Sequence, residues 1–279
     1  NKFSGESLNR FSPTAFLDIV GPSFSKIWDT DGKHFSKVKH LIEPRVSYAR
    51  EPVFEEENRI PLFDEIDLFT GFDVVRYSLI NRFLAKPQGE QDSAREILSF
   101  EFFELYSLNP EQPLQRSKDQ MLTSQRGPLS LRIRFLPSFR TLLQIETRYS
   151  TLFGQIQSNS LSGTFRLGTH NLGVRWSQRI DVERGETRQD QLSLSFRLNL
   201  WPGRLVLSGF STYNVVLAEA TNSAYAIDYT GSCWGMRLEY NIFRVFGNEG
   251  GDSQIRFAIS LKNIGTFFDM TTGGGTSSL

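Results

Sequence analysis

Residues 129–139 alternate between apolar and polar side chains, and this pattern constrains the fold more than any other feature of the sequence. One parity carries two Leu, one Ile and two Phe residues, whereas the other carries Arg132 and Arg134 together with two serines. Side chains alternate across a β-strand with a period of two, so the segment predicts a strand with one apolar and one charged face.

The same period recurs along the whole chain. Several runs reach the roughly 9 to 11 residues of a tilted membrane-crossing strand, beyond the roughly 5 to 6 of a globular strand. Within residues 225–242 the phase slips near Gly231, which predicts a β-bulge. We count twelve runs, at residues 14–28, 38–48, 72–83, 97–108, 129–139, 143–153, 161–167, 172–182, 192–200, 205–216, 225–242 and 255–261.

Composition excludes several classes of protein. Lys and Arg number 31 against 31 Asp and Glu, so no general basic field favours nucleic-acid binding. No stretch approaches the roughly 18 apolar residues of a transmembrane helix. The only cysteine is Cys233, and the three histidines are scattered. These counts leave no internal disulfide, and they predict no metal site and no cofactor.

A soluble β-sandwich and a membrane barrel both alternate, and the charges distinguish them. A water-facing strand tolerates Lys, Glu and Arg in any mixture, but here the mid-strand charges are mostly Arg among Ser, Thr, Asn and Gln. Arg on the lipid face at the midplane costs roughly 2 to 4 kcal/mol, which fixes one register. Lipid tolerates no open strand edge, so the sheet must close.

We therefore predict an all-β, antiparallel transmembrane β-barrel with about twelve strands in this chain. The arginines expected to face its lumen are Arg132, Arg134, Arg175, Arg179 and Arg197. Their partners are either phosphate groups of a ligand or carboxylates of neighbouring strands.

Two patterns could indicate chemistry. His170 and Asn171, with serines nearby, are compatible with a Ser-His-Asn site, but a polar turn explains them equally well because a triad requires geometry. The acidic residues in 55–57 and 64–67 could bind a divalent cation, and a solvated acidic loop is the simpler interpretation. We predict no catalytic residue and no enzyme activity.

Five segments carry a more specific resemblance. In order, they resemble the C-terminal half of the LptD family of lipopolysaccharide-assembly outer-membrane proteins, and together they cover roughly residues 38–265. They are residues 40–48, 60–64, 81–83, 229–238 and 259–265.

The resemblance implies an outer-membrane barrel of twenty-six strands, of which this chain holds the C-terminal part in residues 1–265, followed by a flexible tail in 266–279. It implies insertion of lipopolysaccharide into the outer leaflet through a lateral opening, with an LptE-type lipoprotein plugging the lumen. A periplasmic bridge protein would deliver lipopolysaccharide to an N-terminal domain that is absent here. The alternative is a self-contained twelve-stranded porin, transporter or hydrolase.

By the same resemblance, one strand would form the seam at which the lateral opening lies. Its residues are Ile255, Arg256, Phe257, Ala258, Ile259, Ser260 and Leu261. The family often carries an adjacent Cys-Cys pair where this chain has Ser232 and Cys233. Cys233 is therefore a candidate for one disulfide to a segment outside these residues, and the alternative is a buried small residue near a bulge.

Overall fold

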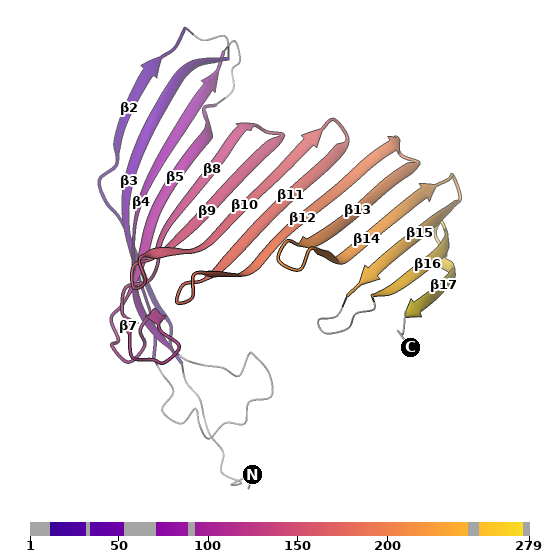
Figure 1. Cartoon of the computed structure of the whole chain (residues 1–279). Helices are drawn as coiled ribbons and strands as arrows, with labels where there is room; N and C mark the ends of the chain where they lie inside the picture. The colour runs from indigo at the N-terminus through magenta and orange to yellow at the C-terminus, as the bar shows by residue number, and fades with distance from the viewer. Residues whose placement is uncertain (1–11, 32–33, 53–70, 89–92, 245–250, 276–279) are drawn as a thin grey trace. The chain divides into compact units, whose positions relative to one another are not determined.

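The computed structural model describes residues 12–31, 34–52, 71–88, 93–244 and 251–275, and all regular structure in them is β-strand (Figure 1). These described segments contain seventeen strands, and every pair among them with a defined register is antiparallel. None of the described segments forms a helix long and apolar enough to cross a membrane. The predicted all-β antiparallel class is confirmed.

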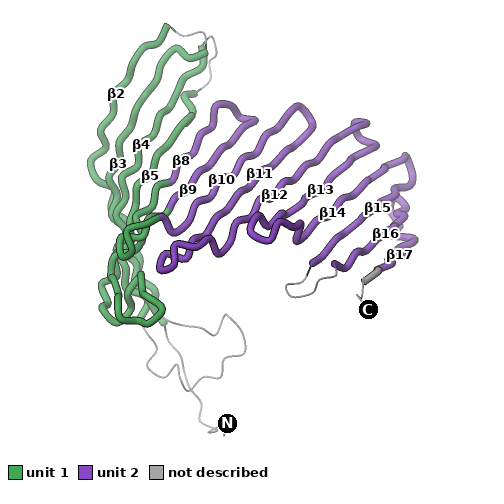
Figure 2. The backbone as a smooth tube through the Cα atoms, in the orientation of Figure 1, with its two compact units in different colours: residues 1–131, 148–155 green, residues 132–147, 156–279 purple. Residues whose placement is uncertain are grey.

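The strands fall into two compact units (Figure 2). Unit 1 contains β1 (Ala15–Val20), β2 (Phe24–Asp29), β3 (Phe35–Glu51), β4 (Phe72–Pro87), β5 (Arg95–Ser107), β6 (Gln115–Arg116) and β7 (Thr123–Ser124). β8 (Leu129–Ser138) and β9 (Thr141–Ser150) contribute residues to both units. Unit 2 contains β10 (Gln155–Leu167) except for its first residue, which falls in unit 1. It also contains β11 (His170–Asp181), β12 (Glu186–Trp201), β13 (Leu205–Asn214), β14 (Glu219–Thr230), β15 (Trp234–Phe243), β16 (Asp252–Leu261) and β17 (Gly265–Gly275).

The order of hydrogen-bonded strands follows the order of the chain. It runs β1-β3-β4-β5-β8 and then continues in sequence to β17, while β2 also pairs with β3, and β6 and β7 form a separate two-stranded sheet. No pairing joins β1 or β2 to β17 among the described residues, so this sheet is not closed. Closure into a barrel therefore stays a prediction.

β1 and β2 lie end to end beside β3. The ladder pairs Val20 with Arg45 and Phe24 with Ile42, so the first segment has one residue more than β3 between these two pairs. The extra residue makes a bulge opposite Pro44, whose carbonyl accepts a hydrogen bond from the Gly21 backbone N–H at 2.8 Å. The run predicted at residues 14–28 is thus a strand interrupted once.

The bulge predicted near Gly231 is wrong. A tight turn lies there, closed by a hydrogen bond from the Gly231 N–H to the Trp234 carbonyl at 2.8 Å. Residues 225–242 therefore belong to two strands, β14 and β15, and Tyr229 pairs with Met236 across the turn. Across this turn an odd-numbered residue pairs with an even-numbered one, so the apolar residues change from odd to even positions, as they would after a bulge. The alternation of apolar residues alone therefore does not distinguish a turn from a bulge.

The tail expected to be flexible from residue 266 is instead β-strand as far as Gly275. Asn263, at φ 66°, and Gly265, at φ 107°, make the turn that returns the chain after β16. Phe268 then pairs with Ile259 and Met270 with Phe257, so β17 continues the apolar face. The small residues at 271–275 masked this pattern in the sequence.

Paired residues share a face of the sheet, and the two faces of unit 2 differ as predicted. One row across β10–β13 is Leu161, Trp176, Leu192 and Tyr213, and the row on the opposite face is Ser162, Arg175, Ser193 and Thr212. Gly209 is required on the apolar face because a Cβ there would lie 2.7 Å from the Tyr225 ring and 3.0 Å from the Phe196 ring.

The sheet has almost no buried apolar core. Among the described residues, Ile80, Ala85 and Ala226 are the only buried hydrophobic side chains. Large apolar side chains in mid-strand are instead open, as at Leu194, which is 51% exposed, and Ile227, which is 41% exposed. The apolar face therefore still requires an apolar partner.

Candidate functional site

The polar face of β3–β5 neutralises its own charges. Arg76 Nη2 lies 2.5 Å from Glu101 Oε1, and Arg82 Nη1 lies 2.9 Å from Glu43 Oε2. These pairs join neighbouring strands, since Ile80 pairs with both Glu43 and Glu101 in the ladder. Guanidinium groups here are satisfied by carboxylates of the same sheet, so this face offers little net charge to a ligand.

The polar face of β14–β17 is paired in the same way. Arg237 Nη1 lies 3.1 Å from Asp228 Oδ1 and its Nε lies 2.9 Å from Glu239 Oε2. Arg256 forms a bidentate pair with Asp269, which belongs to the unpredicted strand β17. The arginine of the supposed seam strand is thus held by a carboxylate.

The polar face of β10–β12 is different, because four of its arginines have no carboxylate partner among the described residues. Arg166, Arg175, Arg179 and Arg197 are all exposed, and none has a side-chain partner among the described residues. β10 and β13 contain no Asp or Glu at all. Two carboxylates near the ends of β11 and β12 are engaged by other groups, Asp181 by Arg188 at 3.1 Å and Asp190 by the Trp176 indole N–H at 2.7 Å.

The structure brings three of the five predicted lumen-facing arginines together. Arg175, Arg179 and Arg197 share the polar face of β11 and β12, because the ladder pairs them with Ser193, Gln189 and Asn171 respectively. Arg132 lies on β8 and forms an ion pair with Glu146 at 3.0 Å, so a neighbouring strand satisfies it. Arg134 is exposed on the same strand. Whether these side chains face a lumen stays a prediction.

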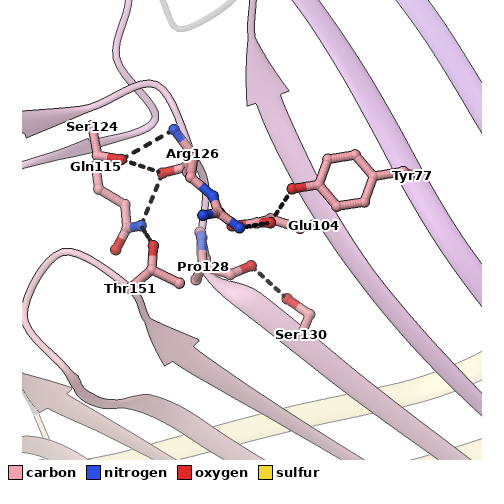
Figure 3. A network of polar contacts seen from close by, with 8 residues as sticks. All are labelled: Tyr77, Glu104, Gln115, Ser124, Arg126, Pro128, Ser130 and Thr151. Carbon is pink, nitrogen blue, oxygen red and sulfur yellow. Dashed lines mark hydrogen bonds and ion pairs between the residues drawn. The ribbon is translucent and has the colours of Figure 1, made fainter.

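A buried carboxylate that sequence reasoning missed lies at the end of β5 (Figure 3). The side chain of Glu104 is only 2% exposed. Arg126 donates to both of its oxygens, from Nε at 3.1 Å and from Nη2 at 3.0 Å, and the Tyr77 hydroxyl donates to Oε2. These hydrogen bonds to Glu104 raise the pKa of Arg126 above its ordinary value.

This network anchors the long connection between β5 and β8. Residues 125–127 run beside β5, with the Gly127 N–H donating to the Leu105 carbonyl at 2.7 Å. Gln115 adds a second anchor, since its amide nitrogen donates to the Arg126 carbonyl at 2.9 Å and to Thr151 Oγ1 at 3.0 Å (Figure 3). The sequence signal was a carboxylate at an apolar-parity position, between Phe102 and Tyr106.

Cys233 lies in the turn between β14 and β15, where it is exposed and free. The alternative that it is a buried small residue is therefore wrong. Its carbonyl accepts a hydrogen bond from the Lys262 N–H at 2.9 Å, and the neighbouring rings of Tyr229 and Trp234 lie 5.2 Å apart. An exposed thiol is compatible with a disulfide to another segment, which stays a prediction.

The expectation that residues 255–261 form the last strand is wrong. These residues belong to β16, which pairs with β15 on one side and with β17 on the other. Ala258, for example, lies between Arg237 and Asp269 in the ladder. A strand paired along both edges has no free backbone groups with which to form a seam.

The remaining candidates offer no site. His170 Nδ1 accepts a hydrogen bond from the Asn199 backbone N–H at 3.1 Å, and no serine hydroxyl contacts His170 within the described part of the chain. The acidic residues at 55–57 and 64–67 lie outside the described residues. Where the structure is described, no group of three or more His, Cys, Asp or Glu residues could hold a metal ion.

Neither a known family model nor a curated protein matches this chain. The candidate site therefore depends on the geometry alone, and its most distinctive part is the set of unpaired arginines on β10–β12.

Proposed function

We propose that this chain forms part of the wall of an outer-membrane β-barrel that inserts lipopolysaccharide into the outer leaflet through a lateral opening. The resemblance of residues 40–48 and 229–238 to the LptD family supports the choice of substrate. The exposed apolar face of the sheet supports the membrane.

The observation that carries the proposal is the shortage of buried apolar side chains. Removing a Leu or Phe side chain from water is worth roughly 1.5 to 3 kcal/mol. A soluble sandwich gains this free energy by packing two apolar faces together. Here Leu172, Leu194 and Ile227, on three strands, remain open instead, and lipid chains would supply the missing contacts.

The height of the apolar face fits a bilayer. On β12 every second residue from Leu192 to Leu200 is apolar, and past a bulge at Leu200 the apolar face continues with Trp201, which pairs with Leu205. Eight residues at about 3.4 Å each span about 27 Å along the strand, or about 21 Å at the usual tilt of about 40°. The apolar band of outer-membrane barrels is about 25 Å tall. At one end of this parity, Trp176, Gln178 and Asp190 form a hydrogen-bonded polar group, as expected where lipid gives way to water.

The connections supply an orientation. In unit 1 the long connections 52–71 and 108–128 leave one end of the strands, and 88–94 leaves the other. In unit 2 the connection 244–251 leaves one end, while 168–169, 202–204, 231–233 and 262–264 leave the other. Outer-membrane barrels carry long loops outside and short turns in the periplasm. Within each unit, the proposal therefore assigns the strand ends that carry the longer connections to the outer face of the membrane.

A complete translocon would require further partners. These are a plug lipoprotein of the LptE type in the lumen and a periplasmic bridge that delivers lipopolysaccharide. Strands beyond those described would close the barrel, because the described sheet has unpaired edges and such edges do not persist in lipid.

Controlled depletion of the protein in its host tests the proposal. We expect newly made lipopolysaccharide to disappear from the cell surface while outer-membrane proteins continue to arrive there. The folded protein should require detergent for extraction and should change its gel mobility on heating. Unchanged surface lipopolysaccharide with altered uptake of small solutes would instead favour the self-contained porin or transporter, and extraction without detergent would contradict any membrane barrel.

A further inference from the structure

We propose that Arg166, Asn171 and Arg197 form a binding site for phosphate groups carried on a sugar. The three residues lie on adjacent strands and share one register level, because Asn171 pairs with Arg166 on one side and with Arg197 on the other. Because paired residues share a face of the sheet, the three side chains lie on one face of unit 2, and all three are exposed.

The spacing suits one phosphate group. Neighbouring strands lie about 4.8 Å apart, so the backbones of Arg166 and Arg197 are separated by about 10 Å. Both arginine side chains are long enough to converge above Asn171. Two guanidinium forks and one carboxamide could then donate to the three terminal oxygens of a phosphate. Ser208 extends the row, because it pairs with Arg197 on β13.

The contrast with the rest of the sheet is what indicates a ligand. On the same face of unit 2, Arg237 and Arg256 each contact a carboxylate within the sheet. In β10–β12, four arginines share a face with serine and asparagine side chains and have no carboxylate partner among the described residues. Like charges in one surface repel one another, and a bound anion relieves that repulsion.

A phosphorylated sugar fits this surface better than a simple anion. Arg175 and Arg179 continue the positive charge along β11, at about 14 Å steps from Asn171. Ser195 on β12 pairs with Gly173, so it offers a hydroxyl group between the levels of Asn171 and Arg175. A ligand with phosphate groups and sugar hydroxyls would contact both the arginines and the serine hydroxyl group. Inorganic phosphate would contact the side chains of one register level only.

The location also fits the transport route, a point that rests on the proposed function. Asn171 is the second residue of β11, next to the short turn 168–169. In the proposed barrel this end of β11 faces the periplasm. A phosphorylated sugar that enters the barrel from the periplasm would therefore reach this site near the start of its path.

Ligand-observed saturation-transfer NMR on the protein folded in detergent micelles tests the site. The probes are glucose 6-phosphate, glucose and inorganic phosphate, the last as a competitor. We expect glucose 6-phosphate to bind and glucose not to bind. The double variant Arg166→Gln with Arg197→Gln should weaken binding at least fivefold, whereas Arg237→Gln with Arg256→Gln, the matched carboxylate-paired control, should weaken it less than twofold.

A second variant separates geometry from charge. Arg166→Lys with Arg197→Lys keeps both charges but loses the bidentate forks, so we expect binding two- to threefold weaker than in the unchanged protein. If the Gln double variant does not fold, as judged by loss of its β-strand signal in circular dichroism, the affinity of the Lys double variant tests the site in its place. Equal affinity of all variants, or equal loss in the control pair, would overturn the site. Stronger binding of inorganic phosphate than of glucose 6-phosphate would overturn the sugar assignment.

These outcomes are independent of lipopolysaccharide transport. Binding in micelles requires no transport, so its absence would remove the site and leave the depletion result standing. Conversely, retained binding together with normal surface lipopolysaccharide after depletion would remove the proposed transport and leave the phosphate site.

Discussion

Replacing Leu194 by arginine distinguishes a lipid-facing sheet from a water-facing one. Leu194 lies on the apolar face of β12 and is 51% exposed. Its neighbour Ser195 is exposed on the opposite, polar face. Ser195→Arg is therefore a matched control that introduces the same side chain one residue away, with the other orientation.

The expected magnitude follows from the depth of Leu194 in the apolar band. The centre of the run from Leu192 to Leu200 is Phe196, so Leu194 lies about 5 Å from the middle at the usual tilt. Arginine on the lipid face should there cost about 2 to 3 kcal/mol, or about 30- to 140-fold in the folding equilibrium. If the face were in water, a change at a half-exposed position should stay within about 0.5 kcal/mol.

The assay is urea unfolding of the protein in lipid vesicles, followed by tryptophan fluorescence. We expect Leu194→Arg to lower the free energy of unfolding by at least about 2 kcal/mol and Ser195→Arg by less than about 0.5 kcal/mol. Equal effects of the two variants would refute the assignment of faces. A neutral Leu194→Arg would refute the membrane interpretation itself.

Three further predictions concern single side chains. Arg126→Ala should cost about 3 kcal/mol, because it leaves the Glu104 carboxylate buried with one guanidinium partner fewer, and limited proteolysis within residues 109–128 should become faster; an unchanged cleavage rate would contradict the anchor. Asn263→Val should cost about 1 to 2 kcal/mol at its positive φ, whereas Asn263→Gly should be neutral, and chemical unfolding compares the two. The complete gene product should change its gel mobility on reduction, and Cys233→Ser should not; identical migration of both would count against a disulfide.

The sequence predicted the strands well because each long run carries its own parity signal. Residues 192–200 read as a strand and lie within β12, since neighbouring strands do not alter which side chains alternate. The turn at residues 231–233 was missed because a phase slip has two structural causes. β17 was missed because its last residues are small, although Asn263 before Gly265 was a usable turn signal.

The site was less predictable, because it depends on which arginines find partners. Arg82 meets Glu43 across a ladder that joins residues far apart in sequence, and no local pattern predicts that register. The sequence indicated Arg175 and Arg197 as members of a polar face, but it did not indicate that they lack carboxylates. Arg166 was overlooked because residues 161–167 read as only a short, weak strand.

Pro44 and the bulge opposite it constrain how this sequence can evolve. The Pro44 carbonyl accepts a hydrogen bond from the Gly21 N–H, so the backbone nitrogen of Pro44 points toward the same bulge. Because proline has no N–H, no hydrogen-bond donor is left without a partner there. A Cβ at position 21 would lie 2.9 Å from the Pro44 ring. A change at either position alone therefore meets a clash or an unpaired backbone group. Natural variants should exchange both positions together or neither.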